Sequence, residues 1–146
     1  MQLDDSLSMR MVPRWDALGL SRSIYKQLSH MYYEPQRVYH TLYHIDDLLT
    51  KQELYFPDVH HMSYPGADVI CDLDLSGLGD PPDKYDQTTA KVRAEYGRYS
   101  DEQWAIGRKK FLASFLARPK IFHTETFAYP ETQARENLSR ELSSYE

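Results

Sequence analysis

Two histidines, His40 and His44, stand four residues apart in the N-terminal half of the chain. Side chains four apart lie on one face of an α-helix, and imidazole rings bind metals and phosphate groups. On such a helix the apolar residues form one stripe and the polar residues gather on the opposite side. The stripe consists of Val38, Leu42, Ile45 and Leu49, and the polar side of His40, His44, Asp47 and Lys51. Two interpretations follow: a solvated polar face, or a cleft in which His44, with or without His40, binds a metal or a phosphate.

The elements that position this pair are predicted to be helices. A helix over about residues 36–55 carries the histidines and ends before Pro57. A preceding helix begins at Ser21 and stops at Glu34, because the residue before a proline disfavours the helical conformation. Residues 1–14 contain Asp4 and Asp5 and no apolar run, so we expect a loosely ordered N-terminus.

The C-terminal half also shows helical signals. Prolines and glycines interrupt residues 56–79, which leaves room for one short helix within 67–78. Asp80 precedes two prolines, and this arrangement predicts a helix start with Asp80 as the cap. Residues 100–103 read SDEQ, the pattern of a capping box, and the run RKK at 108–110 is expected on the solvated face of the helix that follows. With a last helix near 134–145, residues 15–146 are predicted to form an all-α domain, a single compact bundle of five to six helices.

The bulk composition agrees with one folded domain. The chain has 146 residues, 41% of them hydrophobic and 27% charged, as in ordinary globular proteins. Its formal charge of -5 does not favour nucleic acid as a partner, although a local basic patch stays open. Cys71 is the only cysteine, so no disulfide forms within the chain. The sequence contains no run of about 18 apolar residues, so it predicts no membrane span, and we expect a cytoplasmic protein.

Three segments carry a family resemblance. Residues 34–45 read EPQRVYHTLYHI, which resembles the motif E-P-x-R-x-Y-H-x-L-x-H-I of predicted metal-dependent phosphohydrolases of the HD superfamily. Residues 72–79, DLDLSGLG, are similar to the family's D-A-D-L-S-x-L-G motif, and residues 115–122 and 133–138 are similar to its C-terminal segments. The resemblance covers most of residues 15–142 and implies a reduced HD-domain-like fold.

The same resemblance implies a metal site. Such enzymes hold a divalent metal, Mn, Mg, Fe or Zn, which activates a water molecule against a phosphoester. Their ligands are a histidine from an early helix, a His-Asp doublet and an aspartate from a later helix. Carried over to this chain, the metal ligands are His44, Asp58 and Asp74, and the candidate substrate-binding residues are Arg37, His40 and Asp72.

The chain departs from the family at the doublet. Residues 55–59 read YFPDV where the family has W-F-H-D-x-V, so Pro57 replaces the histidine and offers no ligand atom. Only fifteen residues separate Asp58 from Asp74, where the family places further helices. A structural use of Asp72 and Asp74, as helix caps or ion-pair partners, is the alternative to a site.

Two functions remain open, and with them the question of enzymatic activity. The first is a catalytically impaired relative that acts by binding a protein or a nucleotide. The second is an active metal-dependent phosphohydrolase, acting on a nucleotide or another phosphoester with a rearranged ligand set. The shortened centre predicts uncovered apolar surface, which a second copy of the chain or another protein would cover.

Overall fold

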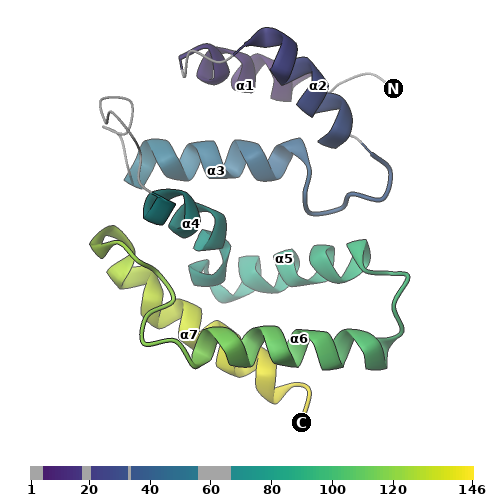
Figure 1. The fold of residues 1–146 in the computed structure, drawn as a ribbon, viewed down its shortest axis with the longest axis vertical. Helices are drawn as coiled ribbons and strands as arrows, with labels where there is room; N and C mark the ends of the chain where they lie inside the picture. Colours follow the sequence, from purple (N-terminus) through teal and green to yellow (C-terminus); the bar gives the residue numbers. More distant parts are fainter. Residues whose placement is uncertain (1–4, 18–20, 33, 56–66) are drawn as a thin grey trace. The chain divides into compact units, whose positions relative to one another are not determined.

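The computed structural model describes residues 5–17, 21–32, 34–55 and 67–146, and every regular element in these residues is a helix. This confirms the all-α class, although the described residues form seven α-helices rather than five to six. Contacts within the chain divide it into two compact units, Met1–Tyr64 and Pro65–Glu146, and Figure 1 labels the helices of each. None of the helices in the described ranges has the length and apolar character needed to cross a bilayer.

The N-terminal unit contains three helices, α1 (Asp5–Ala17), α2 (Arg22–Tyr32) and α3 (Leu42–Tyr55). Its buried apolar core consists of Leu7, Met11, Tyr25 and Leu42, and against it pack Val12, Trp15, Tyr32, Ile45 and Leu49. A helix thus begins at Asp5, within the segment that the sequence predicted to be loosely ordered. Leu7 and Met11 stand four apart on α1, so both side chains enter the core when the helix forms.

Charged side chains also join α1 to α3. Arg14 Nη1 lies 2.7 Å from Asp46 Oδ1, and Arg14 Nε lies 2.8 Å from Glu53 Oε1. On α2, Tyr25 is buried, while Ile24 and Met31 are each about half exposed.

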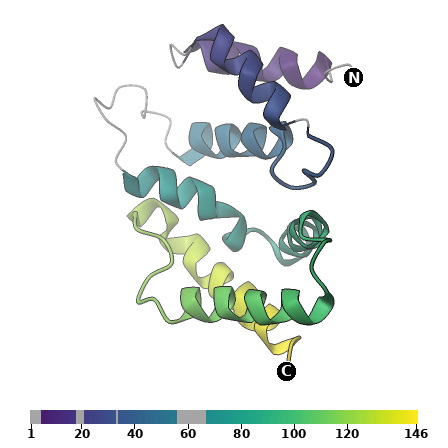
Figure 2. The same ribbon diagram turned by 45° about the vertical axis from the view of Figure 1, so that its right-hand side comes forward.

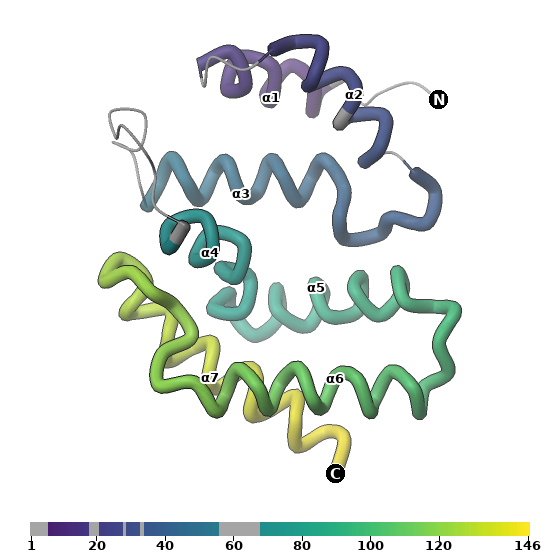
Figure 3. Tube along the Cα trace, in the orientation of Figure 1, coloured from purple at the N-terminus to yellow at the C-terminus, as the bar shows by residue number. Residues whose placement is uncertain are grey.

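The C-terminal unit contains four α-helices and two short 3-10 helices. These elements are α4 (Ala67–Leu75), η2 (Ser76–Gly79), α5 (Pro82–Glu95), α6 (Asp101–Leu116), η3 (Glu125–Phe127) and α7 (Ala128–Ser143). A short turn joins α5 to α6, and the two helices are inclined to each other (Figure 2, Figure 3). Helix α7 packs on both η2 and α6, and it crosses α6 in both ribbon views (Figure 1, Figure 2).

Local capping explains where two of these helices begin. The Ser100 side chain accepts a hydrogen bond from Gln103 N, and the Gln103 side chain accepts one from Ser100 N. This confirms the capping box of α6. The predicted cap of α5 is wrong. Pro81 occupies the cap position without a side-chain bond, and Asp80 Oδ2 lies 3.4 Å from Lys84 Nζ instead. Pro82 stands in the first turn, where a missing N–H is tolerated.

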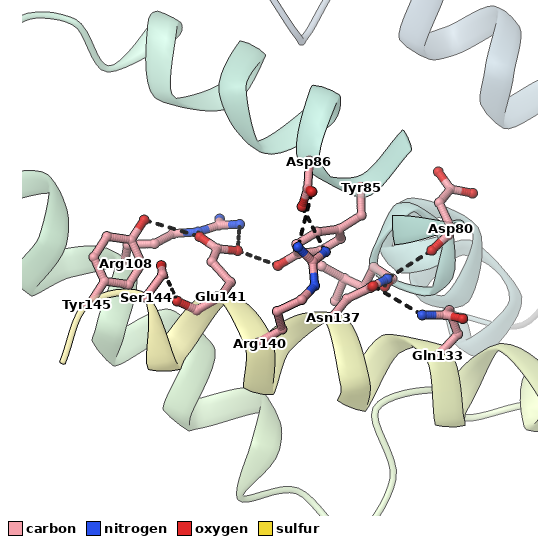
Figure 4. A network of polar contacts seen from close by, with 11 residues as sticks. Asp80, Tyr85, Asp86, Arg108, Gln133, Asn137, Arg140, Glu141, Ser144 and Tyr145 are labelled. Atoms are coloured by element: carbon pink, nitrogen blue, oxygen red, sulfur yellow. Dashed lines mark hydrogen bonds and ion pairs between the residues drawn. The ribbon is translucent and has the colours of Figure 1, made fainter. Parts of the chain in front are cut away.

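A polar network around Glu141 connects α5, α6 and α7 (Figure 4). The Glu141 carboxylate accepts bonds from Arg108 Nε at 2.7 Å and Tyr145 Oη at 3.2 Å, and also from the hydroxyl of Tyr85. The Arg108 side chain is 11% exposed, so the prediction that residue 108 faces solvent is wrong. A buried cation needs a carboxylate partner, and Glu141 supplies one from the facing helix.

Candidate functional site

Helix α3 begins later than the sequence predicted. Leu42 is its first residue, and the backbone N–H of His44 donates to Thr41 O at 3.0 Å. His40 therefore precedes the helix, and the prediction that it shares a helical face with His44 is wrong. The two rings are nevertheless close, with centroids 5.8 Å apart, and the Tyr39 ring lies 4.9 Å from His40 and 4.6 Å from His44. These three rings form an aromatic cluster at the start of α3.

Arg37 lies just before this cluster and is held from one side. Its Nε donates to Met31 O at 2.9 Å and to Glu34 Oε2 at 3.2 Å. Its guanidinium carbon lies 5.2 Å from the centre of the Tyr32 ring. These contacts use the Nε atom and one face of the guanidinium group, and the described residues make no hydrogen bond to its two Nη atoms. Four N–H groups in a planar fork are thus oriented for an anion.

The polar side of α3 is partly occupied by contacts within the unit. Lys51 Nζ lies 3.3 Å from Asp47 Oδ2, one helical turn away, and the Lys51 side chain is 12% exposed. His44 is half-buried, whereas His40 is exposed. Of the residues predicted to bind substrate, Arg37 and His40 therefore lie close together in sequence and remain accessible.

Asp72, the third predicted substrate-binding residue, is a scaffold residue in this structure. It is 0% exposed on α4. Its Oδ1 accepts the backbone N–H of His123 at 2.7 Å, and its Oδ2 accepts the backbone N–H of Thr124 at 2.8 Å and the Thr124 hydroxyl at 2.6 Å. Both oxygens of this carboxylate therefore have donors, and the carboxylate fixes the segment that enters η3.

The predicted metal ligands lie in separate parts of the chain. His44 belongs to the N-terminal unit, and Asp74 is an exposed residue of α4 in the C-terminal unit. Asp58 lies outside the described residues. Among the residues that are described, no three His, Cys, Asp or Glu side chains form a group that could hold a metal ion. The ligand set therefore stays a prediction.

The C-terminal motif residues fasten a turn to α7. The Arg135 guanidinium donates to the carbonyl oxygens of Leu116 at 3.2 Å and Arg118 at 2.7 Å. Glu131 accepts the backbone N–H groups of Ile121 and Phe122, each at 3.0 Å. We did not predict these roles from the sequence. The available signal was the acid–base pair at positions 131 and 135, which the structure joins at 2.9 Å.

The DLDLSGLG segment also packs closely on α7. Asn137 Nδ2 donates to Leu78 O at 2.9 Å and Asp80 O at 2.8 Å. A Cβ atom at Gly79 would lie 2.7 Å from Pro130 Cβ, closer than side-chain carbons approach, so the position needs glycine. Packing and hydrogen bonding alone thus account for Asp72, Gly79 and Asn137.

Comparison of the chain with protein-family models, with curated proteins and with solved structures finds no match in any of the three. Functional inference therefore depends on the side chains described above.

Proposed function

We propose that this protein is a catalytically impaired, HD-phosphohydrolase-like helical protein that binds a nucleotide or another small phosphorylated molecule through Arg37 and His40. The observation that carries the proposal is the guanidinium group of Arg37, which is oriented by Met31, Glu34 and the Tyr32 ring while its Nη atoms keep their donors. Paired N–H groups in one plane bind two phosphate oxygens at once.

Two features support impaired catalysis. Pro57 stands where the similar family has a metal-binding histidine, and proline has no ligand atom. Asp72, in the second motif, gives both of its oxygens to the segment at His123 and Thr124. The residues of this motif therefore have a structural role that accounts for their presence. Their presence is thus weak evidence for a retained catalytic reaction.

The neighbouring rings suit a ligand that carries an aromatic base. Tyr39 and His40 lie next to Arg37 in the chain, and flat rings at a phosphate site offer stacking surfaces. Glu34 weakens anion binding, because its carboxylate lies 3.2 Å from Arg37 Nε and repels an anion. We therefore expect a modest affinity that rises when this charge is removed.

Titration calorimetry with ADP tests the proposal with one variant that should bind ADP more weakly and one that should bind it more tightly. Arg37→Lys keeps the charge but loses the planar fork, and it should weaken binding by roughly tenfold, the effect of one good charge-assisted hydrogen bond. Glu34→Gln keeps an acceptor for Arg37 Nε and removes the repulsion, so it should bind ADP more tightly. Arg10→Lys, in the same unit, is the matched control and should bind as the unchanged protein does.

The helical circular dichroism of each variant shows whether the fold is intact. Unchanged ADP binding in a folded Arg37→Lys protein would overturn the proposed site. Equal weakening in Arg10→Lys would show a general charge effect and would overturn it as well.

An active metal-dependent phosphohydrolase is the second candidate. One observation favours it: Asp74, unlike Asp72, has an exposed side chain on α4. Metal analysis of protein purified without chelators, followed by hydrolysis assays with manganese, separates the two functions. A retained enzyme would carry stoichiometric metal and lose both metal and hydrolysis in His44→Ala and Asp74→Ala. Hydrolysis that survives in both variants would exclude these two ligands.

A further inference from the structure

Charge is unevenly distributed along the chain. Residues 103–124 contain five lysines and arginines and no aspartate or glutamate. This stretch carries +5 and the whole chain carries -5, so the remaining residues carry -10. The stretch comprises most of α6 and the turn that follows it.

One face of α6 displays this charge together with an apolar side chain. Ile106, Lys109, Lys110 and Ala113 follow the spacing i, i+3, i+4, i+7, which places them on a single helical face. All four are exposed, and Ile106 is 60% exposed. The opposite side of α6 faces the unit's interior, where Leu112 and Phe115 are buried.

Helix α6 leads into a turn whose backbone is fixed. Arg118 and Lys120 are exposed there, and the Arg118 guanidinium carbon lies 4.0 Å from the centre of the Phe115 ring. The Arg135 side chain holds the carbonyl oxygens of Arg118 and Pro119. We call Ile106, Lys109, Lys110 and Ala113 the basic face.

The cations of the basic face are not neutralised within the unit. Arg108, which adjoins them, pairs with Glu141. Lys109, Lys110, Arg118 and Lys120, by contrast, form no ion pair with any described residue. Uncompensated cations on the exposed face of a helix therefore favour an anionic partner.

We propose that the basic face is a docking surface for an acidic peptide segment of another protein, a segment that also carries an apolar side chain to cover Ile106. Charge complementarity supplies the attraction, and the exposed Ile106 supplies a contact that a phosphate backbone would not use. The charge of -10 outside the stretch opposes a long polyanion such as a nucleic acid, whereas a short acidic segment contacts only the basic face. This surface is separate from the one assigned to Arg37, so each proposal can fail alone.

Fluorescence anisotropy with a labelled peptide of about 12 residues, rich in glutamate with leucine at every fourth position, tests this surface on the full chain. Such a peptide, when helical, spans roughly 18 Å, which is long enough to cover Ile106, Lys109 and Lys110 together. Lys110→Glu should weaken binding by roughly tenfold, the effect of reversing a charge at a complementary contact. Ile106→Ser should weaken it several-fold without changing the net charge.

Lys91→Glu is the matched control, because Lys91 is an exposed lysine on α5 in the same unit and its replacement changes the net charge equally. It should bind the peptide as the unchanged protein does. Equal weakening in Lys91→Glu, or no effect of Ile106→Ser, would overturn the proposal, since either result indicates a diffuse charge effect. A single-stranded oligonucleotide of the same charge that binds more tightly than the peptide would also overturn it and would assign the face to nucleic acid. Circular dichroism of each variant confirms that α6 is intact.

Discussion

Asp72 shows how a residue in a family-like motif can belong to the scaffold. Its carboxylate is buried and accepts three bonds from His123 and Thr124. Asp72→Asn replaces one acceptor oxygen with an NH2 group that faces donors, so we expect a loss of about 2–4 kcal/mol in the free energy of unfolding. Glu136→Gln, at an exposed carboxylate inside α7, should change it by less than about 0.5 kcal/mol. Urea unfolding of both variants measures the difference, and equal values would contradict the scaffold role.

Tyr85 gives the C-terminal unit a dependence on alkaline pH. Burial, and then the hydrogen bond to Glu141, raises the pKa of Tyr85 far above that of an exposed tyrosine. Below about pH 10 both the folded and the unfolded states keep this proton, so the stabilisation is fully present. Above it the unfolded state ionises first, and stability falls as pH rises. The melting temperature should therefore drop less steeply between about pH 10 and 11.5 in Tyr85→Phe than in the unchanged protein.

The matched control is Tyr129→Phe. Tyr129 is 92% exposed on α7 in the same unit, so its replacement should leave the pH dependence of the melting temperature as it is in the unchanged protein. A steeper drop in Tyr85→Phe than in Tyr129→Phe would contradict the assignment.

Among the helices, local sequence signals predicted where helices form but not which side chains pair between them. The capping box at Ser100 and Gln103 is a contact within one turn, and the sequence shows it directly. The burial of Arg108 depends on Glu141, 33 residues away on another helix, and no local pattern indicates that pairing. The late start of α3 did have a local signal, because threonine is favoured before the first residue of a helix and Thr41 stands there.

The candidate site was predictable to a similar extent. Arg37 and His40 could be named from the motif, and both remain accessible. The orientation of Arg37 could not, because it depends on the Met31 carbonyl and the Tyr32 ring of the preceding helix. The burial of Asp72 depends on a segment about fifty residues further along the chain, and such a contact has no signature in a single sequence.

Because η2 packs closely against α7, replacing glycine by alanine should destabilise the protein at Gly79 and stabilise it at Gly107. Gly79→Ala would place a methyl group 2.7 Å from Pro130 Cβ and 2.9 Å from Pro130 O, so it should cost about 1–3 kcal/mol of stability. Gly107→Ala lies inside α6 with nothing within 4 Å of the added carbon, and it should stabilise by about 0.5–1 kcal/mol. Thermal melts of both variants check this. A stable Gly79→Ala protein would show that η2 moves freely away from α7.

At the scale of the whole molecule, the two units differ in how their described residues are stabilised. The N-terminal unit buries four large apolar side chains and relies on exposed or half-exposed ion pairs between α1 and α3. The C-terminal unit buries more of them and adds the networks around Asp72, Glu131 and Glu141. Its buried apolar residues are Val69, Tyr85, Leu112, Phe115, Ile121, Phe122, Phe127, Ala134 and Leu138. Because apolar burial provides most of the free energy of folding, the C-terminal unit should be the more stable.

Each unit contains one tryptophan, Trp15 or Trp104, so their unfolding can be followed separately. In Trp104→Phe the fluorescence of Trp15 reports the N-terminal unit, and in Trp15→Phe that of Trp104 reports the C-terminal unit. We expect the Trp15 signal to change at a lower urea concentration than the Trp104 signal, because the smaller core contributes less to stability. Circular dichroism of each variant, which sees all the helices, should then show two steps. If the Trp15 fluorescence, the Trp104 fluorescence and the circular dichroism all changed at the same urea concentration, the chain would unfold as one cooperative body. The two units would then not unfold independently.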